Sequence, residues 1–243
     1  MPSFADLPTE IEIYLLGFLA DNKKALFSTV RVSQAWHRYT VDLLWRRSSA
    51  NNLADVEEPR RQHYANRLVK LEVTKLWYFY QFRFLSFPDL VEVSLGKNNS
   101  PKDDRLLGTV WISPYLQPSL RKLCLTGSFF LTEHAMDLIC LSCPLLEDLE
   151  LASQFAFTSP NGCLLHSSFN FPKLRRLVYS WGMFASRSAM KRMSEQLPVL
   201  EYLEITAHDL DLWRGVSEPV FPQLKTLFLG LFSRPSIPDL YVR

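Results

Sequence analysis

The sequence contains few residues whose type and spacing could support catalysis or metal binding. Cys140 and Cys143 form a C-x-x-C pair, an arrangement that binds zinc or exchanges disulfides in other proteins. No second such pair follows, and Pro144 comes directly after it, so we interpret both cysteines as packing residues at the end of a helix. The five histidines are scattered singly, and the chain has no phosphate-binding loop, no nucleophile elbow and no H-E-x-x-H motif. We therefore predict a non-catalytic protein without a cofactor or a metal site.

The strongest pattern in the chain is a repeated phrase of the form P-x-L-x-x-L-x-(L/I/V/Y). Its copies are separated by 22 to 30 residues, and they begin at Asn66, Pro88, Pro118, Pro144, Pro172, Pro198 and Pro222. Each phrase ends in alternating apolar and polar residues, a pattern typical of a strand with one buried face. In one copy, Leu149 and Leu151 point one way, whereas Asp148 and Glu150 point the other. The proline stops the preceding helix because it fixes φ and lacks an N–H.

Helical stretches are predicted between the phrases, such as one that carries Ala135, Leu138 and Ile139 on one face. A strand and a helix in each unit of about 25 residues resemble the leucine-rich repeat, in which parallel strands line a concave surface and the helices lie outside. The resemblance implies an α/β solenoid of about seven repeats over residues 66–243. The alternative is an ordinary α/β domain in which the repeated phrases occur by coincidence. No clear polar cap follows the last phrase, which fits a C-terminally truncated chain.

The first 46 residues lack the phrase and follow a helical pattern instead. Ile11, Leu15, Phe18 and Leu19 recur at helical spacing, and Asp21 begins a polar turn before a second apolar stripe. Three short helices are predicted, and a module of this size buries little surface by itself. We therefore expect a partner to stabilise it.

This module resembles the F-box, which binds the Skp-type adaptor of cullin-based (SCF) ubiquitin ligases. The resemblance is carried by Leu7-Pro8-x-Glu10-Ile11, Leu15-Leu16-x-Phe18-Leu19, Leu26, Val32-Ser33-x-x-Trp36 and Leu44-Trp45-Arg46. Two positions depart from the family pattern, which usually has an aspartate at Ala25 and an aliphatic residue at Arg31. The resemblance implies that the residues that contact the adaptor, or pack the module internally, are Leu7, Pro8, Ile11, Leu15, Leu16, Phe18, Leu19, Val32 and Trp36.

Residues 47–65 are polar and mixed in charge, and we interpret them as a connector that is partly helical. The whole chain has 27 basic and 25 acidic residues, a net charge of +2. So small a charge predicts no generic binding to nucleic acid or to an anionic membrane. The N-terminus lacks a signal-peptide pattern and no apolar run could span a bilayer, so we expect an intracellular protein, in the cytoplasm, the nucleus or both.

The polar positions of the strands form a candidate substrate-binding strip, because alternate residues of a strand face away from the core. The charge along this strip changes sign from repeat to repeat, which favours a specific protein partner over nucleic acid. The residues that we select for substrate binding are Lys122, Asp148, Glu150, Arg176, Tyr202, Glu204, Phe228 and, at the rim of the strip, Trp181.

An F-box followed by leucine-rich repeats implies a substrate-recognition adaptor of an SCF ubiquitin ligase. Such a protein binds the Skp-type adaptor, and through it the cullin, at one end and a target protein at the other. Two alternatives remain open. One is a leucine-rich-repeat interaction scaffold that acts outside ubiquitination, and the other is a repeat protein whose N-terminal helices only cap the first repeat.

Overall fold

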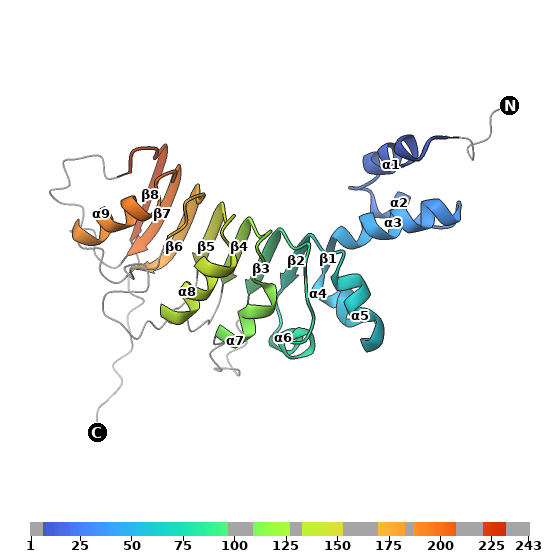
Figure 1. Cartoon of the computed structure of the whole chain (residues 1–243), viewed down its shortest axis with the longest axis horizontal. Helices are drawn as coiled ribbons and strands as arrows, with labels where there is room; N and C mark the ends of the chain where they lie inside the picture. The colour runs from blue at the N-terminus through green and yellow to red at the C-terminus, as the bar shows by residue number, and fades with distance from the viewer. Residues whose placement is uncertain are drawn as a thin grey trace, which may run out of the picture.

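Eight strands form one parallel sheet in which the spatial order of the strands is their order in the chain (Figure 1). The computed structural model describes residues 7–96, 109–126, 133–152, 170–182, 187–207 and 221–231. The strands are β1 (Arg47–Ser49), β2 (Lys70–Val73), β3 (Glu92–Gly96), β4 (Lys122–Thr126), β5 (Asp148–Ala152), β6 (Arg176–Gly182), β7 (Tyr202–Ala207) and β8 (Thr226–Leu231). The α/β class predicted from the sequence is confirmed.

Helices precede the sheet and alternate with its strands. The described helices are α1 (Thr9–Phe18), α2 (Lys23–Thr29), α3 (Gln34–Arg46), α4 (Ala50–Ala54), α5 (Glu58–Ala65), α6 (Leu76–Phe82), α7 (Thr109–Ile112), the 3₁₀ helix η2 (Ser113–Tyr115), α8 (Glu133–Ser142) and α9 (Arg187–Gln196). Figure 1 shows α6, α7 and α8 on the same side of the sheet. No helix in the described part of the chain has the length and apolar character needed to cross a lipid bilayer.

Each of the seven phrases becomes one strand, from β2 to β8, and the strands are in register. The second leucine of each phrase is therefore part of a single row across the sheet, which consists of Leu71, Val93, Leu123, Leu149, Leu177, Leu203 and Leu227. Every member of this row except Leu227 is buried. The strand phase expected from the alternation of apolar and polar residues is thus confirmed.

The proline of the phrase lies in a tight turn that joins a helix to the next strand. In the turn before β5, the N–H of Leu146 donates to the carbonyl oxygen of Cys143 at 3.2 Å, so Pro144 occupies the second of the four turn positions. Proline is favoured there because its fixed φ matches the turn. The residue directly before the proline is also buried in several copies of the phrase. Examples are Phe87, Cys143 and Phe171. The phrase thus supplies a core residue before the proline as well as after it.

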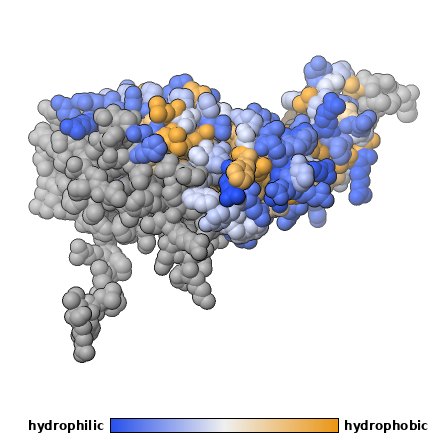
Figure 2. All heavy atoms as spheres, turned by 60° about the horizontal axis from the view of Figure 1, so that its bottom comes forward, coloured by the Kyte–Doolittle hydropathy of each residue, from blue (hydrophilic) through white to orange (hydrophobic). Residues whose placement is uncertain are grey.

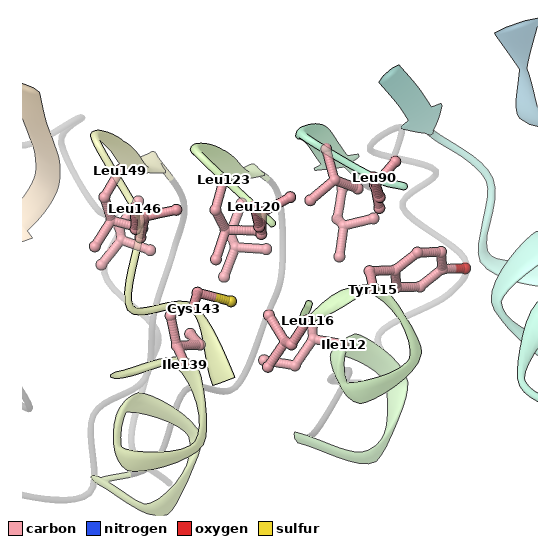
Figure 3. Packing of buried hydrophobic residues seen from close by; sticks show 14 of the residues in the cluster. Leu90, Ile112, Tyr115, Leu116, Leu120, Leu123, Ile139, Cys143, Leu146 and Leu149 are labelled. Atoms are coloured by element: carbon pink, nitrogen blue, oxygen red, sulfur yellow. The ribbon is translucent and has the colours of Figure 1, made fainter. Parts of the chain in front are cut away.

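The core lies between the sheet and the helices on one of its faces (Figure 3). Leu123 and Leu149 project from β4 and β5 toward Ile139 of α8 and Ile112 of α7. Met193 of α9 belongs to the same buried cluster. Because α6 to α9 all contribute to this core, no described helix covers the opposite face, which we call the open face.

Residues 47–65, which the sequence predicts to be a partly helical connector, contain β1, α4 and α5. Ser48 of β1 pairs with Leu71 of β2, and α4 and α5 place Leu53 and Ala65 in the core. Burial of a polar residue is tolerated here because the hydroxyl of Ser48 accepts a hydrogen bond from Nδ2 of Asn52 at 3.0 Å. This segment is therefore the first strand-and-helix unit of the sheet.

The three N-terminal helices form a small module, with α1 and α2 packed on α3. Its buried residues are few: Leu16, Leu26, Thr29 and Thr40. The hydroxyls of Thr29 and Thr40 form a hydrogen bond with each other at 2.9 Å, which connects the end of α2 to α3. Figure 1 shows that α3 runs directly into β1, so no flexible linker separates the module from the sheet.

Candidate interaction surfaces

The N-terminal module leaves much of its apolar surface uncovered. We define the N-terminal apolar surface by the exposed apolar residues of α1, α2 and the turn after α2, which are Ile11, Ile13, Tyr14, Leu15, Phe18, Phe27 and Val32. The most exposed members are Phe18, at 70%, Phe27, at 65%, and Tyr14, at 65%. The rings of Tyr14 and Phe18 lie 4.8 Å apart in an edge-to-face arrangement, so they form one continuous aromatic patch.

Apolar residues occur nearly all round α1, yet this helix buries only Leu16. A helix with this composition is normally enclosed on every side, because an exposed apolar side chain does not gain the favourable free energy of transfer out of water. The other described helices of the module do not enclose it, since the main contact of α1 is with α3 and most of its apolar side chains remain exposed. The uncovered faces of α1 therefore have the character of a surface that binds another protein.

The structure separates the predicted adaptor-binding residues into two groups. Pro8, Ile11, Leu15, Phe18 and Val32 are exposed and can contact a partner, whereas Leu7, Leu19 and Trp36 are half-buried. Leu16 is completely buried inside the module, so it is one of the residues that pack the module internally. The indole N–H of Trp36 donates to Oε1 of Glu12 at 3.0 Å, so part of its role is to hold α3 against α1.

Sequence reasoning missed Ile13, Tyr14 and Phe27 as members of this surface. A search for one stripe at helical spacing selects residues on one face of α1, whereas Ile13 lies on the opposite face and Tyr14 lies at the edge of the stripe, one turn before Phe18. The signal available in the sequence was the run from Ile11 to Leu19, in which only Glu12 and Gly17 are not apolar.

The open face carries the predicted substrate-binding strip, and its charged residues pair with one another from strand to strand. Nζ of Lys122 lies 2.7 Å from Oδ2 of Asp148, and Nη1 of Arg176 lies 2.8 Å from Oδ1 of the same carboxylate. Arg176 also lies 3.5 Å from Glu150 and 5.2 Å from the centre of the Tyr202 ring. One ladder of interactions therefore joins β4, β5, β6 and β7.

The ladder raises the pKa values of Lys122, Arg176 and Tyr202. A hydrogen bond to Asp148 raises the pKa of Lys122. For Arg176, burial opposes the charged form, but the hydrogen bond and charge of Asp148 outweigh it and raise the pKa. The hydroxyl of Tyr202 donates to Oε2 of Glu204 at 2.7 Å, and this bond raises the pKa of Tyr202.

The alternating charges thus have a structural role that the sequence reading did not include. Asp148 is already engaged on both sides, and Lys122 and Arg176 are its partners. Glu204 has no ion pair within the described residues, and Phe228 on β8 is 55% exposed. Glu204 and Phe228 are therefore the strip residues with the most capacity left for an external partner, whereas the side chain of Trp181 lies outside the described residues.

A second ladder, which sequence reasoning missed, lies one residue before the strands. It includes a pair between Arg121 and Glu147, and Glu201 pairs with both Arg175, at 3.3 Å, and Lys225, at 2.8 Å. The hydrogen bond from Lys225 lowers the pKa of Glu201. The sequence did carry a signal for this ladder. The residue after the first leucine of the later phrases alternates in charge from one phrase to the next. These pairs are largely exposed, so each contributes little stability by itself.

The three cysteines in the described part of the chain are free thiols without the properties of a reactive or metal-binding site. Burial raises the pKa of Cys140 to about 11 and that of Cys143 to about 12, so both stay protonated at neutral pH. Burial also raises the pKa of Cys124 on the open face to about 11, and the charge of Glu150 adds to this effect. Within the described residues, no group of histidine, cysteine and carboxylate side chains could hold a metal ion.

The helix side of the molecule is mostly hydrophilic, with separate groups of hydrophobic residues among the residues not drawn in grey (Figure 2). Phe84 and Leu141 are each 82% exposed, and Trp77 and Tyr80 of α6 are partly exposed. Single exposed apolar residues are common on protein surfaces and do not by themselves define a site.

Comparison with known proteins gives no match, either to protein-family models or to curated proteins. The structure itself therefore defines the class, an α/β protein with an eight-stranded parallel sheet, a helical N-terminal module with an exposed apolar surface, and a charged open face.

Proposed function

We propose that this chain is an F-box/leucine-rich-repeat protein, the substrate-recognition adaptor of an SCF-type ubiquitin ligase. In this proposal the N-terminal apolar surface binds the Skp-type adaptor, and the open face of the sheet binds a target protein. The ubiquitin-transfer chemistry belongs to the cullin-bound partners. This chain contributes proximity, since it converts a bimolecular encounter between ligase and target into an oriented one.

The observation that carries the proposal is the exposure of α1. The helix buries only Leu16, whereas Phe18 is 70% exposed. Its other exposed apolar residues are Ile11, Ile13, Tyr14 and Leu15. This combination is expected of a helix whose remaining apolar side chains are covered by a partner. The repeat of one strand per phrase, with all strands parallel and in chain order, supports the leucine-rich-repeat half of the proposal.

The same geometry argues against a module that only caps the sheet. A cap has to cover the apolar edge of the first repeat. Here α1 and α2 pack on α3, and neither has an extensive contact with a described strand. Figure 1 shows α1 above α3 and apart from the strands of the sheet. Its apolar residues are therefore directed at something other than the first repeat.

The test is co-expression with a Skp-type adaptor, followed by affinity capture of the complex. We expect stoichiometric capture by the wild type and loss of capture by a Phe18→Ala/Val32→Ala variant, because both side chains are exposed on the N-terminal apolar surface. Phe84→Ala is the matched control, since Phe84 is even more exposed but lies outside the module.

Circular dichroism must show that all three proteins are folded. Failure of the folded wild type to capture the adaptor would refute the proposal, and so would equal loss of capture in the control. Capture of the adaptor without recruitment of a cullin would instead favour an interaction scaffold that acts outside ubiquitination.

A further inference from the structure

A cavity of about 400 Å³ lies where the N-terminal module joins the sheet. It is formed by the turn after α1, the first residue of α2, the end of α3 and the starts of β1 and β2. Its apolar lining includes Leu43, Leu44 and Val69. The N–H of Val69 donates to the carbonyl oxygen of Arg46 at 3.0 Å, which holds the end of α3 against β2 and so fixes this side of the cavity.

The charged side chains that line the cavity are mainly basic. Three cations, Lys23, Arg46 and Arg47, contribute to the lining, and Asp21 is the acidic residue among them. Arg47 lies 3.4 Å from Asp21, whereas neither Lys23 nor Arg46 has an ion pair within the described residues. The lining therefore has a net charge of +2, the difference between three cations and one carboxylate.

We infer that this cavity binds a small soluble organic phosphate with an apolar body. A phosphate monoester carries a charge of about −1.5 to −2 at neutral pH, which matches the excess positive charge of the lining. Arginine binds phosphate oxygens through its planar set of donors, and Lys23 supplies a third cation from another helix. Leu43, Leu44 and Val69 supply an apolar wall for the body of the ligand. Sites of this volume and mixed lining are common at junctions between domains.

The position of the cavity gives such a ligand a structural consequence. It would contact α2, α3, β1 and the residue before β2 at once, and so would fix the orientation of the N-terminal module relative to the sheet. This inference does not depend on the function proposed for the module, because it rests on the cavity lining alone.

Octyl phosphate is a suitable probe, measured by isothermal titration calorimetry at low salt on the full chain. We expect one site per chain, at which octyl phosphate binds more tightly than either inorganic phosphate or octanol. Inorganic phosphate lacks the apolar body, and octanol lacks the phosphate group. Binding should weaken as the salt concentration rises.

The variant Lys23→Gln/Arg46→Gln should weaken the binding of octyl phosphate by about tenfold or more, because it removes two charge-assisted contacts. The matched control is Lys24→Gln/Arg38→Gln, which removes the same charges from the same two helices at residues that do not line the cavity. The control should bind like the wild type.

Three outcomes would overturn the inference: no binding to the folded wild type, equal weakening in both variants, or binding of octanol as tight as that of octyl phosphate. Sedimentation with phosphatidylcholine vesicles that contain phosphatidic acid distinguishes a soluble ligand from a lipid headgroup. Co-sedimentation that depends on Lys23 and Arg46 would also overturn the inference, since it would assign the site to a membrane lipid.

Discussion

Two adjacent residues of β5 differ in role although one peptide bond joins them. Leu149 is completely buried, whereas Glu150 is on the open face and only 3.5 Å from Arg176. We expect Leu149→Ala to lower the free energy of unfolding by about 2–5 kcal/mol, because it leaves a cavity in the core. Glu150→Ala should lower it by about 0–1 kcal/mol, because a partly solvated ion pair contributes little. Urea denaturation measures both values, and equal losses would mean that the strand phase is wrong.

Tyr115 presents the opposite case, a buried polar group that costs stability. Its hydroxyl has no hydrogen-bond partner within the described residues, and its ring stacks on Phe87 with centroids 5.2 Å apart. Burial raises the pKa of Tyr115, so the hydroxyl stays protonated. We expect Tyr115→Phe to raise the free energy of unfolding by about 1 kcal/mol, because the ring packing is kept and the unsatisfied hydroxyl is removed.

Thermal and urea denaturation of Tyr115→Phe test this expectation. Tyr202→Phe is the control, because it removes a hydroxyl that donates to Glu204 at 2.7 Å and should not stabilise the protein. A loss of stability in Tyr115→Phe would show that the hydroxyl has a hydrogen-bond partner and that its burial does not destabilise the fold.

The buried thiols make stability depend on alkaline pH. In the unfolded chain a cysteine loses its proton near its ordinary pKa of 9.0, whereas burial keeps Cys124 and Cys140 protonated up to about pH 11. Above pH 9 the unfolded state therefore binds fewer protons than the folded state, and the free energy of unfolding must fall as pH rises.

We expect this fall from about pH 9 to about pH 11, the interval between the ordinary pKa of these thiols and their raised values. Urea denaturation at several pH values should show a shallower decline in Cys124→Ala than in the wild type. The stability of Cys124→Ala relative to wild type at pH 7 serves as the baseline. Identical slopes in the two proteins would contradict the assignment of a raised pKa to this thiol.

At the scale of elements, the ladder on the open face couples three strands through one carboxylate. The side chain of Asp148 is 20% exposed and bridges Lys122 of β4 to Arg176 of β6. We expect Asp148→Asn to lower the free energy of unfolding by about 1–3 kcal/mol, because it leaves two partly buried cations without their partner. Glu147→Gln is the matched control, since the ion pair of Glu147 is more exposed than those of Asp148. This substitution should lower the free energy of unfolding by only about 0–1 kcal/mol.

Chemical denaturation at low and high salt separates the two substitutions. Salt should screen only part of the loss in Asp148→Asn, because the Asp148 side chain is 20% exposed, whereas any loss in Glu147→Gln should disappear, because the Glu147 side chain is 38% exposed. Equal and fully screened losses would show that the open-face ladder is an ordinary surface network.

Seven of the eight strands could be predicted from sequence because each ends a copy of the phrase and alternates apolar with polar residues, and six of them follow its proline. β1 could not, because Arg47 to Ser49 contains no apolar residue and α3 leads into it without a turn. Ser48 is buried there only because β2 and Asn52 provide its neighbours, and these contacts are tertiary. The local sequence pattern predicts a strand when the strand's own apolar side chains form the core. It does not predict a strand that is held in place by contacts with neighbouring elements.

The candidate surfaces could be predicted in outline but not residue by residue. The apolar run of α1 indicated a binding helix, yet periodicity could not show that Leu16 packs inward while Tyr14 remains 65% exposed. Likewise, the alternating signs of Lys122, Asp148 and Arg176 were visible in the sequence, but only the register of the strands shows that these charges neutralise one another.

At the scale of the whole molecule, each strand pairs only with the strands next to it in sequence. Stability in such an array is approximately a sum of local terms, so the end of the array should be its weakest part. Leu227 of β8 occupies the same row as Leu149 but is 43% exposed, and among the described strands β8 has a neighbour on one side only.

We therefore expect the amide protons of β8 to exchange with solvent faster than those of β4 and β5, because the end strand opens without breaking the rest of the sheet. Leu227→Ala should speed exchange in β8 alone, whereas Leu149→Ala should speed exchange in β4, β5 and β6 together. Native-state hydrogen exchange followed by mass spectrometry measures these rates. Uniform protection from β2 to β8 would show that the sheet unfolds as one cooperative unit, and the additive description of its stability would then be rejected.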